Sequence, residues 1–149
     1  MAQTYFGSAL RSGSGTLTDT TDGGFVVLMQ TSTVTTNADG TASSTSVTIP
    51  AGSQLIDLLI DQVQNEVVGG GTATAINATV GTAAAGTQYL SATDVIGGGR
   101  AALTFTAAQL AAMADVGSNT SVLLTVDPNG TISTTQGIYR FTVVYAQKG

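Results

Sequence analysis

Residues 47–63 read VTIPAGSQLIDLLIDQV, and this stretch decides the fold. A β-branched run ends at the Pro-Ala-Gly of residues 50–52, which favours a turn, and an apolar run follows over 55–63. Periodicity alone allows either a helix or a strand there, because Asp57 and Asp61 would share a face in both. The β-branched residues and the preceding turn favour the strand. The stretch therefore predicts two strands joined by a short turn.

The second of these strands has two predicted faces. Strict alternation would turn Ile56, Leu58 and Ile60 toward the core. The opposite face would then hold Leu55, Asp57, Leu59, Asp61 and Val63. Along a strand the two aspartates are about 13 Å apart, too far for the carboxylate pair of a glycoside hydrolase. Three apolar side chains would stand exposed in a row there, so this face is the candidate contact between subunits.

Similar strand patterns, separated by turn residues, run along the rest of the chain. Turn signals include glycine triplets at 69–71 and 97–99 and the Asp-Pro-Asn-Gly of residues 127–130. Between the turns the sequence predicts strands over 25–34, 46–49, 55–63, 74–80, 88–95, 101–105, 121–126 and 138–147. The last strand has one aromatic and apolar face and one mixed face. The first face carries Tyr139, Phe141, Val143 and Tyr145, and the second carries Arg140, Thr142 and Val144.

One helix is predicted, over 107–116. Thr106 and, three residues later, Gln109 form the pattern of a capping box, and Gly117 is placed to end the helix. Its buried stripe would consist of Leu110, Met113 and Ala114.

The composition is typical of an all-β protein. The chain has 26 threonines, which suit a pleated surface, and 19 glycines, which supply turns. About eight to ten short strands with turns between them predict an antiparallel β-sandwich, or jelly roll, with one short helix. The length of 149 residues fits one such domain, over 24–149, preceded by an extended N-terminal arm over 1–23.

The predicted arm, residues 1–23, has no core face of its own. It is rich in Gly, Ser, Thr and Asp, and its large side chains gather near the start of the chain. These are Tyr5, Phe6 and Leu10, with Arg11 beside them. Two interpretations stay open: a tail without fixed structure, or an arm that orders on an adjacent subunit or another partner, with Tyr5 and Phe6 as anchors.

Side chains suited to catalysis are scarce. The chain has no His, no Cys and no Trp, and only 9% of its residues are charged, against a usual share of about 25%. Enzyme and metal sites draw mainly on His, Cys, Lys and clustered carboxylates. The acidic turns, such as 127–130, lack the Glu that completes a calcium loop. We therefore expect a protein without catalytic residues, metal ligands or cofactors.

The charge balance bears on the choice of partner. A formal net charge of -5, with Lys and Arg scattered singly, argues against a nucleic-acid partner. No stretch has the length and apolar character of a membrane span, and the first residues lack a signal-peptide pattern, so we expect no membrane partner and synthesis in a cytoplasm. Soluble surfaces normally carry more charge, so a chain with this composition either exposes hydroxyl-rich strands or buries much of its surface in an assembly, and we favour the assembly.

Three stretches together resemble small virion proteins of tailed bacteriophages. They are residues 47–63, the GGGR of 97–100, and TQGIYRFTVVYAQ over 135–147. The resemblance lies in the order of strands and turns, covers residues 25–147 and includes no catalytic signature. It implies a head decoration (cement) protein, made in the host cytoplasm. Such a protein is a β-sandwich that sits as a homotrimer on the capsid exterior of the virion and braces the major capsid protein.

A second class of function stays open, a tail-fibre or adhesin-type module that binds a glycan or a protein on a cell surface. Sugar-binding sites usually present exposed aromatic side chains. This chain has 5% aromatic residues and no Trp, and most of its aromatics fall in predicted core positions. The sequence therefore favours the decoration protein over the adhesin.

Overall fold

The computed structural model describes residues 25–148. It contains eight strands and one helix in the order β1 (Phe25–Thr35), β2 (Ser43–Ile49), β3 (Gln54–Gln64), β4 (Ile76–Gly81), β5 (Leu90–Asp94), β6 (Gly99–Arg100), α1 (Ala107–Met113), β7 (Thr120–Pro128) and β8 (Ile138–Lys148). The predicted strands are confirmed except for 101–105. After β6 the chain leaves the sheet with one backbone bond, from the Ala101 N–H to the Ile60 carbonyl (2.9 Å), and continues toward α1.

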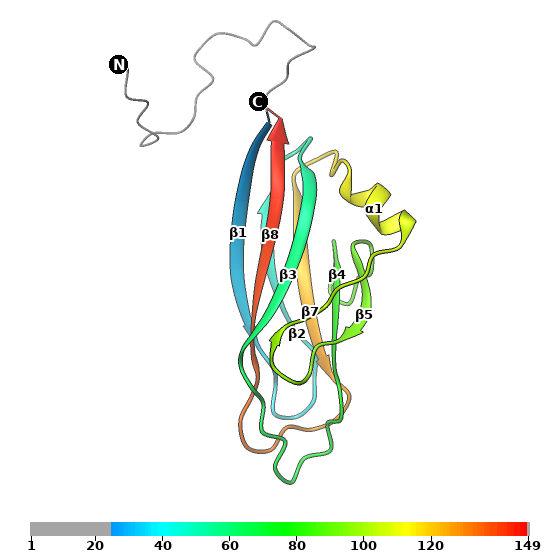
Figure 1. Ribbon diagram of the computed structural model, residues 1–149. Coiled ribbons are helices and arrows are strands. Elements are labelled where there is room, and N and C mark those ends of the chain that lie inside the picture. Colours follow the sequence, from blue (N-terminus) through cyan, green and yellow to red (C-terminus); the bar gives the residue numbers. More distant parts are fainter. Residues whose placement is uncertain (1–24, 149) are drawn as a thin grey trace, which may run out of the picture.

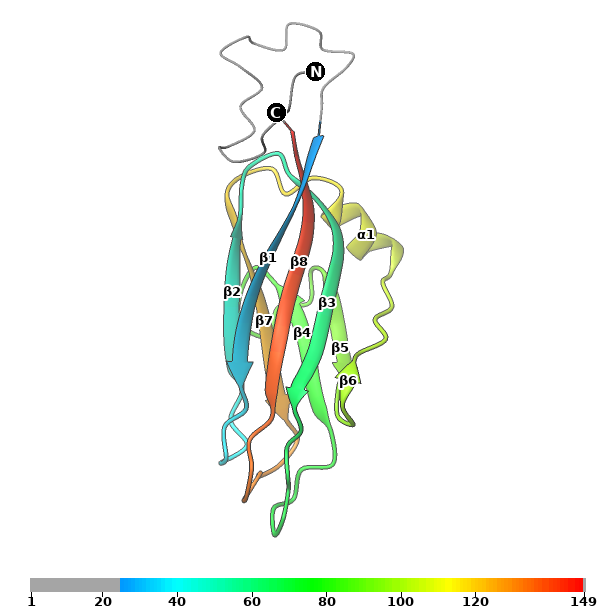
Figure 2. The same cartoon turned by 60° about the vertical axis from the view of Figure 1, so that its left-hand side comes forward.

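The strands form two antiparallel sheets that pack face to face (Figures 1 and 2). Sheet A has the order β1-β8-β3-β6, and sheet B has the order β2-β7-β4-β5. β1 pairs with β8, β2 with β7, β3 with β6 and β4 with β5, as in one long hairpin wrapped across both sheets. This is the strand order of a jelly roll. The predicted fold class is therefore confirmed for residues 25–148.

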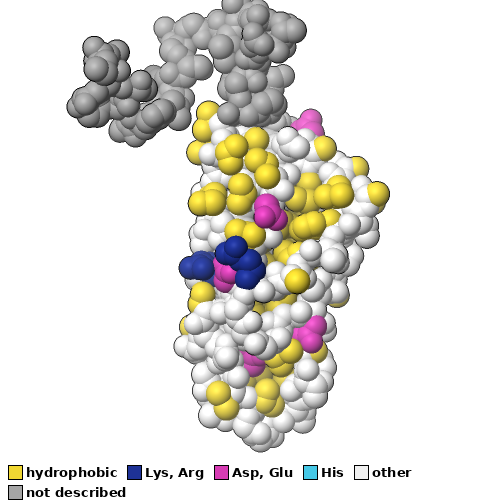
Figure 3. Space-filling model, in the orientation of Figure 1, with side chains coloured by type: hydrophobic (Ala, Val, Ile, Leu, Met, Phe, Trp, Pro, Cys, Tyr) yellow, Lys and Arg dark blue, Asp and Glu magenta, His cyan; other side chains and the backbone are white. Residues whose placement is uncertain are grey.

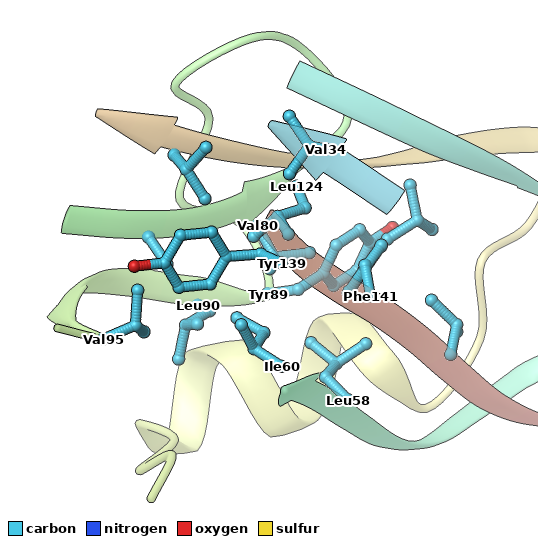
Figure 4. Packing of buried hydrophobic residues seen from close by; sticks show 14 of the residues in the cluster. Val34, Leu58, Ile60, Val80, Tyr89, Leu90, Val95, Leu124, Tyr139 and Phe141 are labelled. Carbon is cyan, nitrogen blue, oxygen red and sulfur yellow. The ribbon is translucent and has the colours of Figure 1, made fainter. Parts of the chain in front are cut away.

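The core lies between the two sheets and is centred on β8. Tyr139 and Phe141 of β8 are fully buried, and they pack among Leu58 and Ile60 of β3 and Val80 of β4 (Figure 4). Val143 and Tyr145 of β8 are buried as well. The aromatic and apolar face of the last strand, read from its alternation, is thus its core face.

β3 departs from strict alternation. A β-bulge lies between Leu55 and Asp57: Leu55 pairs with Tyr145 of β8, whereas Asp57 pairs with the next residue of β8, Val144. The extra residue, Ile56, is 47% exposed, and Leu55 is buried. The prediction that Ile56 faces inward and Leu55 outward is therefore wrong, because the bulge shifts the pattern by one residue. Beyond the bulge the prediction holds, with Leu58 and Ile60 in the core.

Helix α1 begins at the predicted capping box. The Gln109 N–H donates to Thr106 Oγ1 (3.2 Å), and the Thr106 N–H donates to Gln109 Oε1 (2.8 Å). The helix ends at Met113, three residues earlier than predicted. Its buried residues are Gln109 and Met113, so the predicted stripe is wrong for Leu110 and Ala114, which are exposed. Gln109 takes the inward position because its Nε2 donates to Thr87 O (3.2 Å) and to Ser91 Oγ (3.0 Å).

A small polar network closes the core at the end where β8 begins. The buried hydroxyl of Tyr139 donates to Glu66 Oε2 (3.0 Å) and accepts from Gln62 Nε2 (3.0 Å), and Gln62 Nε2 also contacts Glu66 Oε2. Burial first, and then the Glu66 carboxylate, raise the pKa of Tyr139 far above its usual value. The network fixes the loop after β3 to the first residues of β8.

We predict that Tyr139→Phe lowers the free energy of unfolding by about 1–3 kcal/mol, because it leaves Glu66 and Gln62 without their shared partner. Urea denaturation at neutral pH measures this. The matched control is Tyr89→Phe: Tyr89 is also buried, but its hydroxyl makes no hydrogen bond to another group of residues 25–148. Equal effects of the two substitutions would contradict a stabilising role for the network.

Candidate functional site

The outward-facing residues of sheet A lie in cross-strand rows that the strand register fixes. Reading from β1 through β8 to β3, the rows are Val27 with Ala146 and Gln54, Met29 with Val144 and Asp57, Thr31 with Thr142 and Leu59, and Thr33 with Arg140 and Asp61. These rows form the outer face of sheet A, which is turned to the viewer in Figures 1 and 3. Because partners across an antiparallel pair share a face, these side chains form one continuous surface.

The half of this face nearest the start of β1 is apolar. Met29 is 70% exposed and Val27 is 59% exposed, while Val144 and Leu59 are half-buried beside them. We call these four residues the apolar patch. Figure 3 shows hydrophobic side chains gathered here, above the group of charged side chains. In the three rows that contain these four residues, Asp57 is the only charged residue.

The backbone under the patch is held by a hydrogen bond to sheet B. Gln30, between Met29 and Thr31, turns inward, and its Nε2 donates to Thr48 O of β2 (2.8 Å) and to the Tyr145 hydroxyl (3.0 Å). On the outer side, the hydroxyls of Thr31 and Thr142 bond to each other (3.0 Å). The patch therefore lies on fixed strands, with no loop among its residues.

A charged row borders the apolar patch. Asp61 Oδ1 accepts from Arg100 Nε (2.8 Å), and Asp61 Oδ2 accepts from Arg100 Nη2 (3.2 Å) and from Arg140 Nη2 (3.1 Å). The Asp61 side chain is only 12% exposed, whereas those of Arg100 and Arg140 are 57% and 48% exposed. Hydrogen bonding to Arg100, opposed by burial and aided by Arg140, holds the pKa of Asp61 below its usual value. The row presents two guanidinium groups and one covered carboxylate.

The structure brings part of the predicted contact together. Asp57 and Leu59 lie on the outer face as predicted, and Val63 is 52% exposed further along β3. Leu55 is wrong, since the bulge buries it. Asp61 also faces outward, but its carboxylate is largely buried and forms ion pairs with Arg100 and Arg140. The proposed anchors Tyr5 and Phe6, and the candidate contact residues Leu10 and Arg11, lie outside the described residues.

The sequence analysis did not identify the most exposed apolar residues of this face, Val27 and Met29. Val27 and Met29 belong to an apolar run at the start of β1, whose side chains must point to both sides of a strand. This run could have indicated the apolar face, because five consecutive apolar residues in a strand cannot all point into the core. Arg100 and Arg140 are far apart in sequence, and no local pattern indicates that both meet Asp61.

The outer face of sheet B has a different chemistry. Its exposed positions on β2 and β7 are Ser44, Ser46, Thr48, Ser121 and Asp127, and Leu123 is half-buried beside Ser46. The Ser44 and Thr125 hydroxyls bond to each other across the two strands (2.9 Å). One face of the sandwich therefore presents mostly polar side chains, chiefly hydroxyls that water solvates well, and the other presents an apolar patch beside two arginines.

Within residues 25–148, no three His, Cys, Asp or Glu side chains come close enough to hold a metal ion. The helix found in that part of the chain is too short to cross a membrane. No protein-family model, no curated protein and no solved structure matches this chain. The chemistry of the outer face of sheet A is suited to binding, because it combines an apolar patch with charged side chains, Asp57 and the two arginines, that can orient a partner.

The Asp61 group leads to a pH-dependent prediction. Because the folded-state pKa is lowered, Asp61 contributes stability that is present above about pH 4, where the unfolded carboxyl is ionised, and that is lost as pH falls through the folded value. Asp61→Asn should lower the thermal midpoint at pH 7 and make its decline between pH 5 and pH 2 shallower. Asp127→Asn, which removes an exposed carboxylate on the outer face of sheet B, is the control for the change in net charge. A variant slope equal to that of the original chain would contradict the assignment.

Proposed function

We propose that this protein is a non-enzymatic structural component of a bacteriophage virion, a capsid decoration protein. It binds the outer surface of the head and stabilises the lattice of the major capsid protein. The observation that carries the proposal is the contrast between the two outer faces: an apolar patch on sheet A and hydroxyl groups on sheet B. A surface of this kind suits a small protein that buries one side in an assembly and leaves the other in water.

The outer face of sheet A suits many identical weak contacts better than the binding of one ligand in a deep pocket. The patch lies on the face of a sheet, and its members Met29 and Val27 are apolar without hydrogen-bonding groups. In the proposal this face joins the subunits, and oligomers repeated across a symmetric shell then bind it through many weak contacts that act together by multivalency. The resemblance of residues 47–63 and 135–147 to phage virion proteins supports the same assignment. The jelly roll does not decide it, because capsid and lectin domains share that architecture.

In this proposal the protein is a homotrimer, and the outer face of sheet A is its subunit contact. Met29→Asp places a charge on the most exposed residue of the patch, so it should raise the dissociation constant of the oligomer at least tenfold while the thermal midpoint of the monomer stays unchanged. Sedimentation velocity over a range of concentrations measures the association. Ser121→Asp, on the outer face of sheet B, is the matched control. A chain that sediments as a monomer at every concentration contradicts the oligomer.

Location in the virion tests the function itself. Gold-labelled antibodies against this protein, viewed by electron microscopy on purified virions, should label the whole head surface. Labelling confined to the tail would favour the adhesin-type module. Virions without any label would overturn both assignments.

A further inference from the structure

The apolar patch lies next to the point where the described chain begins. β1 starts at Phe25, and two patch residues, Val27 and Met29, follow within four positions. Residues 1–24 therefore join the sandwich at the edge of the patch. This segment is therefore attached beside the apolar face and can reach it without passing over the rest of the sandwich.

The first 24 residues divide into two parts by composition. The large side chains Tyr5, Phe6 and Leu10 fall within the first eleven residues, together with Arg11. Residues 12–24 read SGSGTLTDTTDGG, in which Leu17 is the one large apolar side chain. Thirteen residues span at most about 45 Å, enough to carry residues 5–11 onto a neighbouring molecule.

Residues 5–11 carry a charge opposite to that of the rows around the patch, and the acidic residues of the segment, Asp19 and Asp22, lie outside this stretch. Arg11 is the only charged side chain in residues 1–18, and it directly follows Leu10. Asp57 is the only charged side chain in the apolar rows, and it lies directly beside Val144. The two arginines of the bordering row already bond to Asp61, and of the two other cations of the chain, Arg11 and Lys148, Arg11 is the one within residues 1–24. We therefore match Arg11 with Asp57.

We propose that residues 5–11 of one copy dock on the apolar patch of a second copy, with Tyr5, Phe6 and Leu10 against the patch and Arg11 facing Asp57. The inference deepens the proposed homotrimer and rests on it. A cyclic trimer needs two different surfaces that meet head to tail, and the segment and the patch are two such surfaces. Each copy then gives one segment and receives one.

Cross-linking of cysteine variants tests the docking, because the natural chain contains no Cys. A tagged full-length Phe6→Cys chain is co-expressed with an untagged Met29→Cys chain and treated with a short bismaleimide. We expect the tagged chain to retain the untagged one covalently, at least tenfold more than when the untagged chain carries Ser121→Cys. Mass spectrometry of the product identifies the link between positions 6 and 29.

Two outcomes overturn the inference. One is a yield equal to that of the Ser121→Cys control. The other comes from the double variant Phe6→Cys with Met29→Cys: a cross-linked monomer without cross-linked pairs means that the segment covers its own patch. Both measurements use the purified chain without heads, so they are separate from head labelling. Failed cross-linking beside labelled heads rejects only the docking, and unlabelled heads beside successful cross-linking reject only the capsid role.

An exchange of charges tests the pairing of Arg11 with Asp57. Arg11→Asp and Asp57→Arg should each raise the dissociation constant of the oligomer at least fivefold, and the chain that carries both should return to within about twofold of the original. Asp127→Arg, remote from the patch, controls for the change in net charge. A double variant as weak as either single one would show that the two residues do not meet.

Discussion

The pairing of β8 with both β1 and β3 is the constraint on which the rest of the structure depends. It sends Tyr139, Phe141, Val143 and Tyr145 into the core, and Tyr139 and Phe141 are the two largest fully buried side chains of residues 25–148. The same register places Met29, Val144 and Asp57 in one row on the opposite side. Since a shift by one residue would exchange the two faces, core and outer face are set together.

Features of the fold that depend on local sequence patterns were predictable, whereas part of the site depends on how distant strands pair. The final strand alternates without interruption, and the capping box of α1 is local, so both were correct. The bulge at Ile56 cannot be recognised from the sequence, because its neighbours are apolar on both predicted faces. It therefore reversed the predicted faces of Leu55 and Ile56. The Asp61 group joins β3, β6 and β8, and only the tertiary structure brings its members together.

The difference between the two outer faces links the low charge of the chain to a role. A protein with 9% charged residues can cover its surface with hydroxyl groups or can bury part of an apolar surface in an assembly. This sandwich divides the two surfaces: Ser44, Ser46 and Thr48 are exposed on sheet B, while Val27 and Met29 are exposed on sheet A. Such a division has a physical purpose when one side is buried against other molecules, as the proposed decoration protein requires.

Methionine oxidation footprinting tests the central claim, that the outer face of sheet A is buried in the assembled particle. Met29 is 70% exposed on that face, and Met113 is buried in the core and serves as an internal reference. The rate at which peroxide oxidises Met29 is measured in purified virions and in a free peptide of residues 25–35. Our account predicts that Met29 in virions reacts at least tenfold more slowly than in the peptide, close to Met113. Oxidation of Met29 in virions at the rate of the peptide would contradict it.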